Sequence, residues 1–409
     1  MMKIHPVQAG TLLLVGAAAV GLSLVAPGDV PRYTKVAPPL DTRVACQPTV
    51  PGELLLTGTN LQLAKHGGQT QTIQAPSITT IEQLHTVRGI LPSGGIFGTD
   101  KSWTPCQQAA TNGQVIFPSA EAAQLVLTNP DSREASVDIK IYSSAGELQA
   151  LGTRGINLAP GETRPVAVSV LAASTEGAIG VYWQTSRGRV IASGNTVGTA
   201  QRYVIPPLGS APRHELPGQA AGAEPKLLLL NMNAERASAT VNFHSPTATF
   251  VPAGGEDVSI PPHSVVQLDL AQGVAGEPGA FTVEADRPVS ALLITGGAQP
   301  QAASGAAAAD TALSALLPGG STLQLTNLSA QETSVEVLIG GQPTTLSVAA
   351  RATGVVAIPE GDPVLVEASA EAQLFGAGVT PDATAVIPLT PTKVPDPDPM
   401  EAELVRTLR

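Results

Sequence analysis

The sequence predicts an all-β protein, built from tandem immunoglobulin-like β-sandwich modules that follow an N-terminal signal or anchor helix. Three observations predict this fold class. A strand pattern that ends at asparagine recurs three times in the chain. Each copy divides into about seven short strands with Gly and Pro at the reversals. An uncharged apolar segment lies near the N-terminus.

The composition argues against two classes of protein. Charged residues make up 13% of the 409 residues and aromatic residues 3%, yet the mean hydropathy is positive at +0.16. A disordered chain combines low hydropathy with high net charge, so we expect most of this chain to fold. The 22 Lys and Arg residues are outnumbered by 33 Asp and Glu residues, and this acidic balance argues against a nucleic-acid-binding protein.

Residues 11–26 form the apolar segment and decide the compartment that we expect. These sixteen residues carry no charge and follow Lys3, which is typical of a signal peptide or a membrane anchor. Leu24 lies at the −3 position of the nearest cleavage site and Pro27 follows that site, and both disfavour cleavage. We therefore expect a single-pass cell membrane protein with its bulk outside the cytoplasm. Cleavage would make it a secreted protein, and a buried core helix is the weaker interpretation.

Two cysteines, Cys46 and Cys106, fall in the part of the chain that we expect to be exported. Because oxidation is the default state of cysteine pairs outside the cytoplasm, we predict a disulfide between them. The bridge would close a loop of about sixty residues and remove roughly 4 kcal/mol of unfolded-state entropy. The alternative is a catalytic thiol, for which His66 and His85 are the available partners.

The repeat is aligned on three asparagines. In each copy an apolar strand ends at the asparagine, a polar turn of five or six residues follows, and a serine lies seven residues after the asparagine. The copies are offset by 102 and then 96 residues, which fits one domain per copy. The recurrent polar positions are Asn129, Asn231, Asn327, Ser136, Ser238 and Ser334.

Alternation and turn chemistry indicate a sandwich within each copy. Ile179, Val181 and Trp183 face one way with the period of a half-buried strand, and Pro and Gly mark a turn at 159–161. Short strands with turns every ~8–12 residues are typical of an immunoglobulin-like sandwich. A β-propeller, with about four strands in each blade, is the weaker alternative. The expected strands of the first copy are 124–128, 136–142, 153–158, 163–171, 178–184, 189–196 and 202–205.

Composition breaks and recurrent Val-Ile-Pro elements divide the chain into modules and linkers. Elements of this kind end at Pro118, Pro206, Pro318 and Pro388, and we interpret them as module ends. The Gly-, Pro- or Ala-rich stretches between modules predict linkers that would make the array a jointed rod. The predicted division is 1–27, signal or anchor; 28–44, Pro-rich linker; 45–118, a small disulfide-closed β module; 119–208, the first sandwich repeat; 209–225, linker; 226–297, the second repeat; 298–312, Ala-rich linker; 313–390, the third repeat; and 391–409, tail.

The recurrent polar residues favour a structural role over a ligand site. Asparagine at a strand end caps a turn with its own side chain, and a catalytic site rarely recurs in every repeat. The six histidines show no metal-ligand spacing, and the sequence holds no nucleophile elbow, phosphate loop or dinucleotide fingerprint. His263 aligns with Gly161 and Arg351, which makes it a turn residue. We predict no catalytic residue, no cofactor and no metal site.

Four features carry a resemblance that covers most of the chain. They are the N-terminal apolar segment, Cys-x-Pro at 46–48, Trp-x-x-Cys at 103–106, and strand-Asn modules with segments such as DRPV at 286–289. In these features the chain resembles a family of exported actinobacterial proteins known only as a domain of unknown function, although Gln47 stands where such families usually have Cys-Pro directly. Members are often found among envelope-glycosylation genes. The resemblance therefore implies an envelope partner, and it implies no known activity.

Two functions are consistent with these observations. The first is a non-catalytic, membrane-anchored protein outside the cytoplasm that binds or scaffolds components of the cell envelope, with an envelope protein or glycan as its partner. The alternative is an accessory or carbohydrate-active protein of envelope glycosylation, with the disulfide-closed module as its site. Paired carboxylates about 5–9 Å apart in a cleft would support this alternative.

Overall fold

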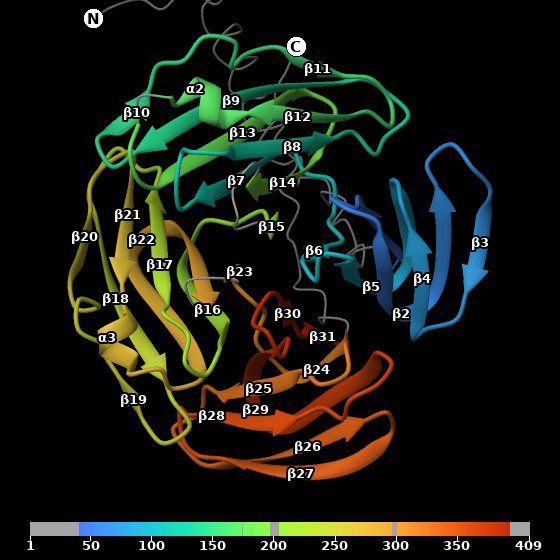
Figure 1. Cartoon of the computed structure of the whole chain (residues 1–409), viewed down its shortest axis with the longest axis vertical. Coiled ribbons are helices and arrows are strands. Elements are labelled where there is room, and N and C mark those ends of the chain that lie inside the picture. Colours follow the sequence, from blue (N-terminus) through green and yellow to red (C-terminus); the bar gives the residue numbers. More distant parts are fainter. Residues whose placement is uncertain (1–40, 174, 197–203, 297–300, 393–409) are drawn as a thin grey trace, which may run out of the picture. The chain divides into compact units, whose positions relative to one another are not determined.

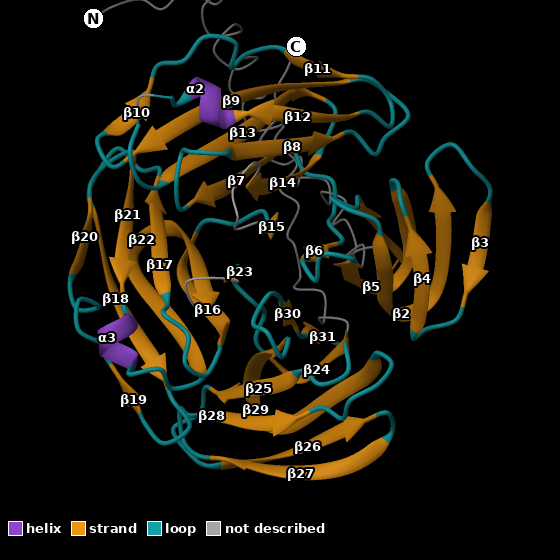
Figure 2. Cartoon of the chain, in the orientation of Figure 1, coloured by secondary structure: helices purple, strands orange, loops and turns teal. Residues whose placement is uncertain are grey.

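Antiparallel β-strands make up nearly all of the regular structure, which confirms the all-β fold class (Figure 1). The computed structural model describes residues 41–173, 175–196, 204–296 and 301–392. The helices of the described residues are short: α2 (Val168–Leu171) and α3 (Ala271–Val274) lie among the strands (Figure 2). The anchor expected at 11–26 lies outside the described residues, and within the described part of the chain no helix is long and apolar enough to cross a membrane.

The first sheet group is a six-stranded antiparallel sheet in the order β1-β5-β2-β3, with β4 on β2 and β6 on β5. Alternate apolar side chains of its longest strands, such as Leu54, Leu56 and Val87, are fully buried in one core. Cys46 and Cys106 form the predicted disulfide, with their Cα atoms 4.4 Å apart. The strands are β1 (Asp41–Cys46), β2 (Gly52–Lys65), β3 (Thr70–Ile73), β4 (Ser77–Ile81), β5 (His85–Gly98) and β6 (Trp103–Pro105).

The second sheet group has two sheets that share one core. One sheet runs β10-β9-β13-β7 with β11 on β9, and the other runs β12-β8-β14-β15. Phe117 and Trp183 of the first sheet pack with Leu125 and Leu127 of the second, all of them buried. The strands are β7 (Asn112–Phe117), β8 (Ala123–Thr128), β9 (Ala135–Ser143), β10 (Gly146–Leu148), β11 (Ile156–Leu158), β12 (Thr163–Ala167), β13 (Ile179–Arg187), β14 (Ile191–Thr196) and β15 (Val204–Ile205).

The third sheet group repeats this plan with one long strand, β22, in the place of β13 and β14. The first half of β22 pairs with β18, and its second half pairs with β17. One strand therefore links the two layers that are separate sheets in the second group. The strands are β16 (Ala211–Gln219), β17 (Lys226–Asn231), β18 (Ala237–His244), β19 (Thr249–Phe250), β20 (Val258–Ile260), β21 (Ser264–Asp269), β22 (Gly279–Gly296) and β23 (Gln301–Ser304).

The fourth sheet group follows the same plan, with β29 as the long strand. β29 pairs with β24 and β26 along its first part and with β25 and β30 along its second part. The strands are β24 (Asp310–Leu317), β25 (Thr322–Asn327), β26 (Thr333–Ile339), β27 (Gln342–Val348), β28 (Thr353–Ala357), β29 (Val364–Val379), β30 (Val386–Pro388) and β31 (Thr390–Pro391).

The range 209–225, expected to be a linker, contains β16. This strand pairs only with β22 among the described strands, and an edge strand tolerates Pro217, which lacks the N–H that a second neighbour would need. Its counterparts β7 and β24 likewise pair with the long inner strands β13 and β29. The Val-Ile-Pro elements before Pro118 and Pro318 therefore lie in strands that open a sheet group, whereas we had interpreted them as module ends.

The Ala-rich range 298–312 also contains strand, namely β23 and the start of β24. Ala302 of β23 packs against Ala377 and Val386 of the fourth group, so small side chains allow a close approach between two groups. The strand expected over 163–171 ends at Ala167 instead, and α2 begins at Val168. Val170 in this helix is 72% exposed, so the alternation that predicted a continued strand is broken there.

The second and third sheet groups share a hydrophobic core. Leu228, Leu230 and Val265 of the third group are buried in the same cluster as the core of the second group. A Cβ atom on Gly180 of β13 would lie 2.9 Å from the Leu230 side chain, so the two groups approach closely. This packing replaces the jointed rod that linkers would have produced.

Polar contacts connect the remaining groups. Gln324 of the fourth group donates a hydrogen bond to the Gln219 carbonyl oxygen of the third, at 2.8 Å. Asp382 of the fourth group accepts from Lys101 of the first group at 2.7 Å. Burial alone would raise the pKa of Asp382, but hydrogen bonds from Lys101 and Thr384 hold it below its usual value. The fourth group is thus tied to the first as well as to the third.

Candidate functional site

The three recurrent asparagines are fully buried, and each makes the same set of hydrogen bonds. The Asn129 side-chain nitrogen donates to the carbonyl oxygens of Arg133, Leu158 and Ala159 at 2.7–3.2 Å, and Oδ1 accepts from the Asp131 N–H. Asn231 and Asn327 bind the equivalent backbone atoms. The donor and acceptor atoms of these three amide groups are occupied by hydrogen bonds to the backbone of the same turn. The side chains therefore fix turns and are not free to hold a ligand.

The recurrent serines lie on strands β9, β18 and β26 at equivalent register positions. Ser136 pairs with Asn157, Ser238 with Ser259, and Ser334 with Ser347 in the neighbouring strand. Ser238 and Ser334 are exposed and Ser136 is half-buried. Each serine lies within its own sheet group, so the structure does not gather the three into one site.

A second element of the repeat contacts the preceding group. Gly161, His263 and Arg351, the aligned turn residues, all have positive φ angles, of 72°, 51° and 53°. A Cβ on Gly161 would lie 2.3 Å from the ring of His66, and His263 stacks on Tyr142 with ring centroids 6.2 Å apart. The Arg351 carbonyl oxygen lies 2.8 Å from Nδ1 of His244 in the third group. These three residues, which we call the corner residues, therefore form part of the face that the second, third and fourth groups present to the group before.

A cationic cavity of about 750 Å³, the cleft, lies where the first and second groups meet. Five of the chain's 22 Lys and Arg residues line it, although the chain as a whole has a net charge of −11. Asp131 is the one carboxylate among the described residues that line it. The basic lining residues are Arg43 on β1, Lys65 at the end of β2, His66, Arg88 on β5, Arg133 after β8, and Arg189 between β13 and β14.

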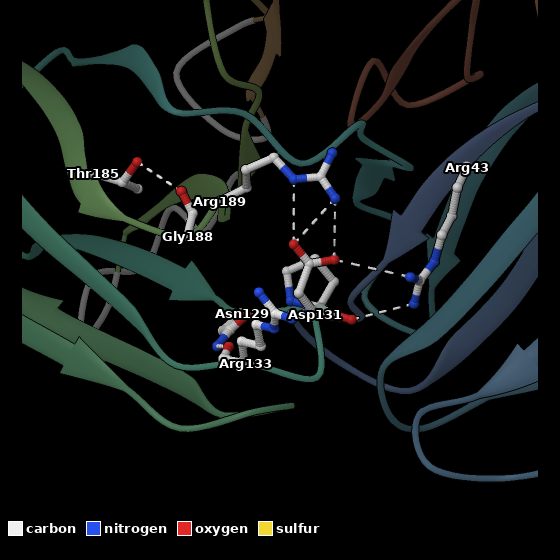
Figure 3. Close-up of polar contacts among 8 residues, drawn as sticks. Arg43, Asn129, Asp131, Arg133, Thr185, Gly188 and Arg189 are labelled. Atoms are coloured by element: carbon white, nitrogen blue, oxygen red, sulfur yellow. Dashed lines mark hydrogen bonds and ion pairs between the residues drawn. The ribbon is translucent and has the colours of Figure 1, made fainter. Parts of the chain in front are cut away.

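Asp131 connects the two walls of the cleft. Figure 3 shows Arg43 and Arg189 on opposite sides of its carboxylate. Arg189 donates from Nε and Nη2 at 3.1–3.2 Å, and Arg43 Nη1 lies 3.8 Å away. Arg43 also donates from Nη2 to the carbonyl oxygen of Pro130 at 3.2 Å. One carboxylate therefore orients two guanidinium groups that come from different sheet groups.

The turn that carries Asp131 into the cleft is the turn fixed by Asn129. The Asn129 side chain accepts from the Asp131 N–H at one end of the turn and donates to the Arg133 carbonyl oxygen at the other. Figure 3 shows the three residues close together in this turn. Asn129, one of the recurrent asparagines of the sequence, thus positions two residues of the cleft, Asp131 and Arg133. The cleft residues themselves were not predicted.

The disulfide lies at the end of β1, the strand that carries Arg43. Both sulfurs are used in the bridge, so the alternative of a catalytic thiol is wrong. Of its two candidate partners, His66 lines the cleft and His85 Nδ1 lies 2.8 Å from the Gln83 carbonyl oxygen.

Within the described part of the chain, no group of three or more His, Cys, Asp or Glu side chains is placed to hold a metal ion.

The architecture and the cleft define an all-β protein of repeated, interlocked sheet groups with a cationic cleft between the first two. The chain belongs to the Family of unknown function (DUF5719), whose model matches residues 102–359. This confirms the resemblance to a family of unknown function, while its exported and actinobacterial character stays a prediction. No curated protein and no solved structure matches the chain. Arg133 and Arg189 lie inside the matched range, and the cleft residues of the first group lie before it.

Proposed function

We propose that the protein is a non-catalytic protein outside the cytoplasm, anchored in the cell membrane by residues 11–26, that binds or scaffolds components of the cell envelope. The observation that carries the proposal is the cleft. It is open to solvent, it has an excess of positive charge, and its walls are held by Asp131 and by the Asn129 turn. A charged cleft whose lining residues are positioned by such contacts is suited to binding an oppositely charged ligand.

The cleft favours binding over glycoside hydrolysis. A hydrolytic site uses two carboxylates about 5–9 Å apart. Among the described residues that line the cleft, Asp131 is the single carboxylate, and two arginines already bind it. An accessory role in envelope glycosylation is the second candidate, because the polar lining also suits a charged saccharide.

Localisation of the full chain tests the first half of the proposal. We expect it to remain with membranes after an alkaline wash, to be cleaved by protease added outside intact cells, and to retain residues 11–26. Sequencing of the mature N-terminus is the direct readout. A start near residues 27–30 would replace anchorage by secretion, and full protection from external protease would overturn the proposed compartment.

Envelope binding tests the second half. The detergent-solubilised full chain is mixed with purified, insoluble envelope saccharide and sedimented at physiological salt. We expect a saturable fraction in the pellet, and a chain that stays in the supernatant at every concentration would contradict a role in binding the envelope.

A further inference from the structure

We propose that the cleft binds a compact ligand that carries phosphate groups, such as a phosphorylated saccharide. The inference rests on the proposed binding function and names the ligand class of the same site. The cleft brings together five permanently charged basic side chains and one carboxylate in a chain whose net charge is −11. Like charges held close together repel one another, and a multiply charged anion removes this cost.

Two of the cations are available to a ligand. Lys65 and Arg133 are exposed, and among the described residues neither has an acidic partner within salt-bridge distance. They lie on opposite walls, since Lys65 ends β2 of the first group and Arg133 follows β8 of the second. A ligand with two negative groups is therefore matched by two cations, next to guanidinium groups whose planar donors suit phosphate oxygens.

The rest of the lining indicates a hydrophilic ligand. Besides the cations it contains the hydroxyl groups of Thr70, Thr86 and Ser132, and His66 is its only aromatic ring among the described residues. A nucleobase or a stacked sugar ring would require aromatic side chains on the walls. Recognition must then come from charge and hydrogen bonds.

The ligand must also be compact. Beyond the cleft the chain is acidic overall, and at physiological salt an exposed charge acts over about 8 Å. A long polyanion would meet repulsion outside the cleft, whereas a ligand confined to about 750 Å³ meets the local positive charge. A flat bilayer surface is less suitable, because the cations line a concave space.

Calorimetric titration of the full chain with inorganic pyrophosphate tests the proposal. We expect saturable binding that weakens as salt is added. The double variant Lys65→Glu with Arg133→Glu should bind at least about tenfold more weakly, since two charge-assisted contacts become repulsive. Among the described residues, neither Lys65 nor Arg133 makes a contact that joins two sheet groups. Thermal unfolding of the double variant checks that the fold is retained.

Arg154→Glu with Arg236→Glu is the matched control, because it makes the same change in net charge at exposed positions outside the cleft. It should bind pyrophosphate within about twofold of the unchanged chain, since exposed charges at a distance contribute little. Equal weakening by both double variants, or no binding by the unchanged chain, would overturn the proposal. Envelope sedimentation without pyrophosphate binding would contradict the ligand class and leave the proposed function standing.

Two further arms distinguish the sources of phosphate. Glucose 1-phosphate represents a free phosphosugar, with glucose as its uncharged control, and phosphatidylglycerol vesicles represent a lipid headgroup, with phosphatidylcholine vesicles as their control. We expect glucose 1-phosphate to compete with pyrophosphate. Vesicle binding that persists in the Lys65→Glu, Arg133→Glu variant, with no competition by glucose 1-phosphate, would refute the cleft as the site and assign binding to a membrane surface.

Discussion

His244 Nδ1 lies 2.8 Å from the carbonyl oxygen of Arg351, so a side chain of the third sheet group binds the corner of the fourth. Because a carbonyl oxygen only accepts, Nδ1 carries a proton, and in the neutral ring Nε2 then accepts from the Thr282 hydroxyl, 2.9 Å away. The lowered pKa of His244 favours the neutral ring in the folded protein. Burial is the main cause that lowers its pKa below the ordinary value.

Acidification should destabilise the protein through His244. Burial and the charges of Arg213 and Arg351 lower its pKa, and the Arg351 carbonyl and Glu284 oppose them. Since the folded pKa lies below the unfolded one, the unfolded state binds the proton more readily, and the free energy of unfolding falls as pH drops through about 6.5. Urea denaturation above and below this pH measures the loss.

The control for this prediction is His244→Gln, whose amide keeps a donor and an acceptor but does not titrate. The difference between the unchanged chain and this variant should grow smaller or reverse as the pH falls. Parallel losses in the two proteins would show that other groups cause the acid sensitivity.

Asn231→Ala should lower the free energy of unfolding by about 3 kcal/mol, because it leaves three carbonyl oxygens of the turn without their buried donor. Ser238→Ala in the same repeat should change it by less than about 0.5 kcal/mol, since Ser238 is exposed. Denaturant unfolding of both variants gives the comparison. A neutral Asn231→Ala variant would argue against the turn-fixing role.

Reduction of the Cys46–Cys106 disulfide should destabilise the protein. The bridge spans 60 residues, and the chain-entropy model predicts a loss of about 4 kcal/mol. The first group has a small core of its own, so we expect the loss to appear first in the amide-exchange protection of β1 and β5. Comparable exchange rates with and without reductant would contradict this.

The second and third sheet groups should unfold together. Leu230→Ala removes a fully buried side chain from the core that they share and should cost about 3 kcal/mol. In scanning calorimetry this variant should lower the melting temperature of both groups in a single transition. Two separate transitions, of which only one shifts, would show that the groups are independent.

The features that were predicted correctly are those with a local or chemical cause. Strand alternation identified the all-β class, and cysteine content identified the disulfide. The asparagine repeat led to turns whose geometry is shared by Asn129, Asn231 and Asn327. In each case the residues that form the sequence pattern also form the strand, the disulfide or the turn that the pattern predicts.

The features that were missed depend on distant parts of the chain. In the sequence, Pro217 indicates a linker, but in the structure it lies on the edge strand β16. The edge position of β16 results from its pairing with β22, which is distant in the sequence. Arg43, Asp131 and Arg189 belong to no motif, because the cleft forms only when two sheet groups meet. A cluster of Arg and Lys in an acidic chain indicates a binding site. Here the cluster forms only in the folded structure, because its residues lie far apart in the sequence.

The corner contacts give the array a direction. Tyr142 and His244, which the corners His263 and Arg351 contact, occupy the same position of the repeat, and in the fourth group that position is Gly340. The corner residue of a repeat that followed the second or third group would contact a ring at this position. The corner residue of a repeat that followed the fourth group would meet Gly340, which has no ring. Insertion of a further repeat would therefore preserve this contact after the second or third group, whereas after the fourth group its corner would need a different contact.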